Sequence, residues 1–206
     1  MTFTIWFMGR PASGKSTLAK RVDNYLRDES VPIENLDGDE IRQNLHPDLG
    51  FTREDRSLNN RRTAFICNLL NRNGIAVVNA MITPFRDSQQ TAREIVEQSG
   101  DFVLIYVKCS VDECEKRDPK GLYEQARNGK IENFTGINHP FEEPHNPDIV
   151  VDTEAETPKE SFEHVREEIH ERGLLETTMA REYNFDLSHS DEQAIKERLQ
   201  DLGYIN

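Results

Sequence analysis

The chain has 206 residues, of which 35% are hydrophobic and 31% are charged, and its formal net charge at pH 7 is −13. This length predicts one domain with a sizeable core and an appendage. The acidic balance argues against a nucleic-acid-binding protein, because such proteins usually carry a basic face. The apolar runs are too short for a membrane-spanning helix, which needs about 20 residues.

The start of the chain lacks a basic region followed by an apolar signal core, and the three cysteines show no CxxC spacing. We therefore expect a cytoplasmic protein with reduced thiols and no membrane partner. The charge balance is +2 over residues 1–93 and −15 over residues 94–206. An anionic ligand is expected in the first half, and the acidic second half is interpreted as a solvated surface.

Apolar segments that resemble buried strands alternate with helical patterns along the chain. Strands are expected at 3–8, 33–36, 75–81, 102–107 and 148–151, and helices at 15–29, 54–72, 86–98, 111–128 and 158–172. Strands that are continuously apolar, rather than alternating with polar residues, are typical of a parallel sheet covered on both faces. The pattern predicts an α/β fold with three layers and a mostly parallel five-stranded sheet.

The later part of the chain suggests a lid and an extension. Residues 129–147 are rich in Gly, Asn and Pro, and such a long loop inside a domain is usually functional, so we expect a lid at about 117–147. The main domain is expected to span residues 1–175. Residues 176–206 would form an acidic C-terminal extension with one helix at 191–202, for which Ser188, His189 and Ser190 are capping candidates.

A glycine-rich motif follows the first expected strand. Gly9 and Gly14 are separated by four residues, and Lys15 and Ser16 follow at once, which is the P-loop pattern. The backbone N–H groups of such a turn and the following helix N-terminus bind phosphate. Lys15 can reach the β- and γ-phosphates of ATP, and Ser16 can ligate Mg²⁺. The expected cofactor-binding residues are Gly9, Arg10, Pro11, Ala12, Ser13, Gly14, Lys15, Ser16 and Thr17. The alternative reading is a glycine turn with a surface lysine.

Two carboxylates follow the second expected strand. Ligands of an open parallel sheet bind beyond the carboxyl ends of its strands, so Asp37 and Asp39 are expected near the terminal phosphate. A carboxylate there can accept a hydroxyl proton or help to hold Mg²⁺. Arg42, about one helical turn further on, could bind a second anionic ligand. The alternative is an Asp-Gly turn in which Asp39 caps a short helix.

Several longer segments resemble the adenylylsulfate kinases in order and spacing. They are LDGDEIR at 36–42, NLHPDLGFTREDRSLNNRR at 44–62, MITPFR at 81–86, KCSVDECEKRDPKGLYEQAR at 108–127 and NFTGINHPFEEPHNPDIVVDT at 133–153. The resemblance covers about residues 3–175. It implies a P-loop kinase of the nucleotide-kinase type, usually a homodimer, that uses ATP and Mg²⁺. Such an enzyme phosphorylates the 3′-hydroxyl of adenosine 5′-phosphosulfate (APS) and gives PAPS, a step of sulfate assimilation. A separate ATP sulfurylase would supply the APS.

The resemblance also implies roles for individual residues. Asp39 matches the general base, with Asp37 as its neighbour, and Phe51 and Phe134 match a pair of rings that sandwich the substrate adenine. The other implied substrate contacts are Arg42, Arg56, Asn59, Ile82, Thr83 and Lys120, and Arg117 belongs to the lid on the ATP side. Without the resemblance, the two phenylalanines would read as core residues, and Arg56, Arg61 and Arg62 as a solvated helix face.

The chain departs from the family pattern at three positions. Thr83 stands where the family usually has Ser, Ala12 where it has Gly, and Arg10 where it has a small residue. These departures leave open a kinase of the same scaffold that acts on another nucleotide-linked acceptor. A non-catalytic nucleotide-binding regulatory subunit is a further alternative. His139 and His145 could ligate a metal, but their spacing fits no usual site, and we expect ordinary loop residues.

Overall fold

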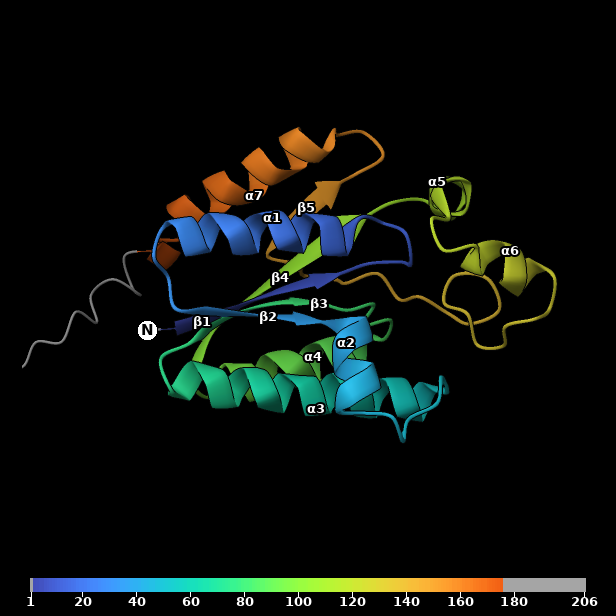
Figure 1. Ribbon diagram of the computed structural model, residues 1–206, viewed down its shortest axis with the longest axis horizontal. Coiled ribbons are helices and arrows are strands. Elements are labelled where there is room, and N and C mark those ends of the chain that lie inside the picture. The colour runs from blue at the N-terminus through green and yellow to red at the C-terminus, as the bar shows by residue number, and fades with distance from the viewer. Residues whose placement is uncertain (1, 176–206) are drawn as a thin grey trace, which may run out of the picture.

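Five parallel strands form one sheet in the computed structural model, which describes residues 2–175 of the chain (Figure 1). The strands lie in the order β2-β3-β1-β4-β5. Their bounds are Thr2–Met8 for β1, Ile33–Asp37 for β2, Ala76–Ala80 for β3, Gly100–Lys108 for β4 and Ile149–Asp152 for β5. The predicted fold class is confirmed, and the strands differ from the expected ones only at their ends. The helix expected at 191–202 lies outside the described residues.

Four long helices cover the two faces of the sheet (Figure 1). Their bounds are Lys15–Asp28 for α1, Arg53–Arg72 for α3, Arg86–Val96 for α4 and Pro158–Glu171 for α7. Helices α1 and α7 pack together on one face, and α3 and α4 on the other. No helix within residues 2–175 is long and apolar enough to cross a membrane.

Strand β1 divides the core into two apolar layers. Phe3, Ile5 and Phe7 belong to the layer that includes residues of α1 and α7, whereas Trp6 and Met8 belong to the layer that includes residues of α3 and α4. Successive side chains of a strand point to opposite faces, so a central strand covered on both sides carries apolar residues on each face. This is why the motif that follows β1 is held on a rigid base.

One sequence prediction about the helices was wrong. The segment 111–128 forms two helices, α5 at Val111–Arg117 and α6 at Leu122–Arg127, rather than one. The break occurs where Gly121 adopts a left-handed φ of 64°, and the carboxylate of Asp118 accepts the N–H of Leu122 at the start of α6. A further helix, α2 at Gly38–Asn44, follows β2, and its N-cap is Asp37 rather than Asp39.

A buried amide joins the end of α3 to the starts of the strands. The side chain of Asn71 is fully buried, accepts the hydroxyl proton of Thr4 at 2.8 Å, and donates to the carbonyls of Phe3 and Ile75 at 3.0 Å each. Its carbonyl oxygen would lie 2.8 Å from a Cβ atom on Gly100, so only glycine fits at the first residue of β4. Buried polar groups with all partners satisfied fix the register of neighbouring elements.

We predict that Asn71→Ala lowers the free energy of unfolding by about 3 kcal/mol, because it leaves a buried hydroxyl and two carbonyls without their partner. Chemical denaturation followed by circular dichroism measures the change. Asn73→Ala is the matched control, since the exposed Asn73 amide bonds only to the carbonyl of Leu69 at 2.7 Å among the described contacts. A loss below about 0.5 kcal/mol for Asn71→Ala, as expected for the control, would contradict this account.

Candidate active site

The P-loop, residues 9–14, lies between the carboxyl end of β1 and the first turn of α1. A Cβ atom on Gly9 would lie 2.5 Å from the carbonyl oxygen of Val107 in β4, so glycine is required for the loop to approach the neighbouring strand. Gly14 precedes α1 with φ 96°, and Ala12 has φ 60°, a left-handed conformation that favours glycine. The alanine is therefore strained at a position where the family pattern has Gly.

The ammonium group of Lys15 lies inside this turn. Lys15 is 8% exposed, and its Nζ donates to the carbonyl oxygen of Arg10 at 2.6 Å. Burial lowers the pKa of Lys15 to about 8, and among the opposing charges are those of Asp39 and Asp37. A cation removed from water and bonded to a neutral carbonyl is well suited to receive a phosphate. Ser16 and Thr17 are exposed at the open N-terminus of α1, where Ser16 is free to ligate Mg²⁺.

Arg117, at the end of α5, is connected to the P-loop through Thr153. Its guanidinium donates to the hydroxyl and the carbonyl of Thr153 at 3.1 and 2.6 Å, and the Thr153 hydroxyl donates to the carbonyl of Ser13 at 2.9 Å. Sequence reasoning missed Thr153. Its position directly after β5 was the available signal, because ligands gather at the carboxyl ends of parallel strands.

The two carboxylates at the start of α2 have different surroundings. An Asp37 oxygen accepts the N–H groups of Asp39 and Glu40 at 2.9 and 3.3 Å, so Asp37 is occupied in starting the helix. Asp39 is exposed, and its carboxylate pairs with Nζ of Lys120 at 2.5 Å. Lys120 comes from the connection between α5 and α6, so this ion pair joins the expected lid to the carboxylate beside the P-loop.

Phe51 and Phe134 lie in two segments that Arg56 connects. The guanidinium of Arg56 donates from Nε to the carbonyl of Phe51 at 3.1 Å and from Nη2 to the carbonyl of Asn133 at 2.7 Å. Burial, together with the nearby charge of Arg42, lowers the pKa of Arg56 to about 10. Arg56 is therefore buried between the two ring-bearing segments rather than forming a solvated helix face.

The two rings have different neighbours. Phe51 is 53% exposed, and the guanidinium of Arg42 lies over its ring at 4.3 Å. Phe134 is buried and packs edge-to-face against Tyr123 with ring centroids 4.9 Å apart. Tyr123, which sequence reasoning also missed, donates its hydroxyl proton to the carbonyl of Pro11 in the P-loop at 3.0 Å. Phe134 is thus supported from the P-loop side.

The remaining predicted substrate contacts are less accessible. Asn59 is buried, and its Oδ1 lies 2.7 Å from Nδ1 of His46, a residue that the sequence did not single out. Thr83 is 1% exposed, has a left-handed φ of 44°, and accepts a hydrogen bond from the indole of Trp6 at 2.8 Å. Its hydroxyl therefore has a partner in the core of this structure, and the expected contact of Thr83 with the substrate stays a prediction. Ile82 beside it is half-buried.

The two lid histidines occupy different environments. His139 is half-buried and its ring packs edge-to-face against Phe85 at 5.5 Å, whereas His145 is exposed. No group of three or more His, Cys, Asp or Glu side chains within residues 2–175 is arranged to hold a metal ion.

A family model described as adenylylsulphate kinase matches residues 1–152. The chain belongs to the adenylylsulphate kinase family. An adenylyl-sulfate kinase of Halothermothrix orenii is 45% identical over 172 residues, which cover 84% of this chain and 91% of that relative.

Solved structures extend the likeness to the fold. An APS kinase of Mycobacterium tuberculosis in complex with AMPPNP and APS is 35% identical, with a TM-score of 0.79, and the match covers 82% of this chain and 98% of that chain. A hexameric APS kinase from Thiobacillus denitrificans is 26% identical, with a TM-score of 0.66, and the match covers 84% of this chain and 30% of that chain. These two solved structures therefore share the fold described above.

The buried Lys15 predicts a specific dependence of stability on pH. Its pKa is about 8 in the folded protein against 10.5 for the ordinary value, so the unfolded chain binds more protons between these pH values. The destabilisation caused by Lys15 is complete below pH 8 and fades as the pH rises towards 10.5. Compared with Lys15→Met, the wild type should gain roughly 2 to 3 kcal/mol of stability between pH 7 and pH 10.

Urea denaturation at both pH values measures this gain. Lys20→Met is the matched control for the loss of a lysine from α1, because Lys20 is exposed on the same helix. A difference between Lys15→Met and wild type that stays constant from pH 7 to pH 10 would show that Lys15 is not held as described.

Proposed function

We propose that this protein transfers the γ-phosphate of ATP to the 3′-hydroxyl of APS and releases PAPS and ADP. The observation that carries the proposal is the meeting of two half-sites at one edge of the sheet. The P-loop with the buried Lys15 forms the first, and Asp39 with the segments of Phe51 and Phe134 forms the second. Membership of the adenylylsulphate kinase family agrees with this assignment.

The donor side would bind the triphosphate of ATP. The P-loop N–H groups and the N-terminus of α1 would bind the phosphates, and Lys15 would exchange the carbonyl of Arg10 for phosphate oxygens. Ser16 would hold Mg²⁺, which when bound neutralises charge on the β- and γ-phosphates. Arg117, held by Thr153 beside the P-loop, would cover the nucleotide on this side.

The acceptor side would bind APS and deprotonate it. Phe51 and Phe134 would hold the adenine, and the cations of Arg42 and Arg56 would balance the charges of the phosphosulfate. As the 3′-oxygen attacks the γ-phosphorus, Asp39 would accept the hydroxyl proton while ADP leaves. Asp37 would orient Asp39 by capping α2, and Lys120 would bring the lid over the reacting groups.

An assay of ADP release that depends on APS tests the function. The wild type should turn over with Mg-ATP and APS, and Asp39→Asn should lower kcat by about 100-fold or more, because the proton acceptor is lost. Glu40→Gln is the matched control, since Glu40 is the exposed neighbour of Asp39 on α2 and no catalytic role is assigned to it. Absence of APS-dependent turnover by the wild type would reject the proposal.

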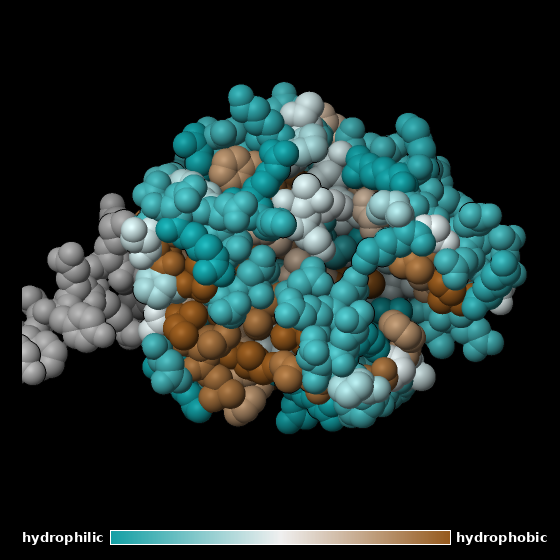
Figure 2. All heavy atoms as spheres, in the orientation of Figure 1, coloured by the Kyte–Doolittle hydropathy of each residue, from teal (hydrophilic) through white to brown (hydrophobic). Residues whose placement is uncertain are grey.

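We further propose that residues 1–175 are the kinase domain, with a lid at about 117–147, and that residues 176–206 are a separate extension. The working enzyme would be a cytoplasmic homodimer that receives APS from a separate ATP sulfurylase. A hydrophobic patch over the C-terminal half of α3 supports self-association (Figure 2). The apolar residues that are exposed or half-buried on α3 are Leu58, Phe65, Ile66, Leu69 and Leu70. A self-complementary helix face of this kind suits a twofold contact.

If this face joins two copies, Phe65→Lys should convert the dimer into a monomer, because Phe65 is 54% exposed and a charge there would be buried between the copies. Light scattering coupled to size exclusion measures the mass. Val150→Lys is the control, since Val150 is 43% exposed on β5 at the edge of the sheet, outside this face. A Phe65→Lys variant that remains dimeric, or a monomeric wild type, would contradict the proposed contact.

A further inference from the structure

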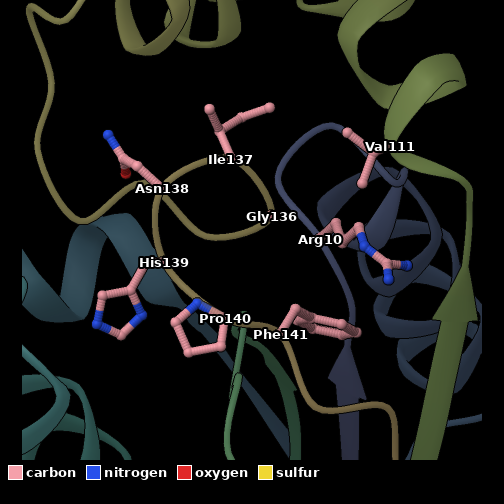
Figure 3. A pocket seen from close by; sticks show the side chains of 8 residues that line it. All are labelled: Arg10, Val111, Gly136, Ile137, Asn138, His139, Pro140 and Phe141. Atoms are coloured by element: carbon pink, nitrogen blue, oxygen red, sulfur yellow. The ribbon is translucent and has the colours of Figure 1, made fainter.

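The side chain of Arg10 extends from the P-loop towards the lid rather than towards the phosphate-binding turn. Its Nη1 donates to the carbonyl of Cys109 at 3.0 Å, and its Nη2 donates to the carboxylate of Glu143 at 3.1 Å. The guanidinium also lies 4.6 Å from the centre of the Phe141 ring. Figure 3 shows Arg10 and Phe141 next to each other in the lining of a pocket of about 460 Å³. The guanidinium of Arg10 therefore binds residues of the lid, Glu143 and Phe141.

Two residues of the lid segment 134–143 contact this one side chain, and a third lies close to it. Glu143 and Phe141 contact the guanidinium, and Gly136 lies above the aliphatic part, where an added Cβ atom would be 3.8 Å from the Arg10 Cδ atom. The Arg10 side chain is only 15% exposed, so these contacts are partly shielded from water. Burial opposes ionisation of Glu143, but the hydrogen bonds from Tyr106 and Arg10 lower the pKa of its carboxyl.

Phe134 stands between two supports that come from adjacent P-loop residues. On one side it packs on Tyr123, whose hydroxyl bonds to the carbonyl of Pro11. On the other side the chain continues through Gly136 to Phe141, which Arg10 holds. The outer surface of the P-loop thus supports the segment that carries Phe134, through Arg10 and through the carbonyl of Pro11. The proposed donor and acceptor sites therefore share one rigid loop.

We propose that Arg10 is a positioning residue of the acceptor site. It fixes the lid segment 134–143 to the P-loop and so holds Phe134 in place to stack on the adenine of the acceptor. This inference rests on the proposed function for the identity of the acceptor. The contact of Arg10 with Glu143 and Phe141 is independent of that function. Removal of the guanidinium would release the segment and weaken acceptor binding. The phosphate-binding N–H groups and Lys15 would be unaffected, because Arg10 meets Lys15 only through its backbone carbonyl.

The central experiment compares Arg10→Met with wild type by steady-state kinetics and by amide hydrogen exchange without ligands. Met keeps an aliphatic stem against Gly136 and removes the charge. We expect KM for APS to rise about tenfold, with KM for ATP within about twofold of wild type. Exchange should accelerate in residues 131–143, because the segment loses its anchor. Arg27→Met, which removes the ion pair between the Arg27 guanidinium and the buried Asp23 on α1, outside the lid segment, is the control and should change neither readout.

A second variant, Phe141→Leu, removes the lid side of the contact without changing the P-loop. It should raise KM for APS in the same direction, and the double variant should show less than the product of the two effects. This variant keeps the test decisive if Arg10→Met does not fold.

Equal rises in the two KM values, or unchanged exchange in residues 131–143, would overturn the inference. If the wild type shows no APS-dependent turnover, the proposed function fails, and hydrogen exchange alone then decides. Faster exchange confined to residues 131–143 would still support the anchor, and unchanged exchange would exclude it.

Discussion

The burial of the Lys15 ammonium inside the P-loop is the interaction around which the rest of the site is arranged. Burial that lowers the pKa of Lys15 to about 8 costs folding free energy, and the bond to the Arg10 carbonyl offsets it only in part. The P-loop keeps Lys15 buried despite this cost, because the loop is fixed at both of its ends. Gly9 lies against β4, and α1 begins directly after Gly14. A bound phosphate would accept from the Lys15 ammonium with charged oxygens, in place of the neutral carbonyl of Arg10.

The P-loop also has an outer side, and that side organises the acceptor half of the site. Its backbone N–H groups would bind the donor phosphates, whereas the Arg10 side chain contacts Glu143 and Phe141 of the proposed lid and the Pro11 carbonyl accepts the hydroxyl proton of Tyr123. Transfer between two nucleotides requires the attacking oxygen and the phosphorus to be aligned at close range. Because the same short loop supports the proposed donor and acceptor sites, the two sites can move little relative to each other.

The charge of the proposed site is opposite in sign to the net charge of the chain. The chain has a net charge of −13, yet the proposed site gathers cations from the P-loop, α2, α3 and the lid. These are Lys15, Arg42, Arg56 and Lys120. Carboxylates oppose them singly, as Asp39 does with Lys120. Cations concentrated at one edge attract two anionic nucleotides, while the acidic surface elsewhere discourages nonspecific anion binding.

The sequence by itself determined the alternation of strands and helices, the P-loop and the family, because hydrophobic period and glycine spacing are local properties of the chain. Only the tertiary structure decided the partners of the site residues. Thr83 bonds to Trp6, and Arg56 bonds to the carbonyl of Asn133, across 77 positions in each case. Thr153 meets Ser13 because the strand order places the end of β5 beside β4, next to β1. Such contacts depend on packing between distant segments, for which the order of residues carries no local signal.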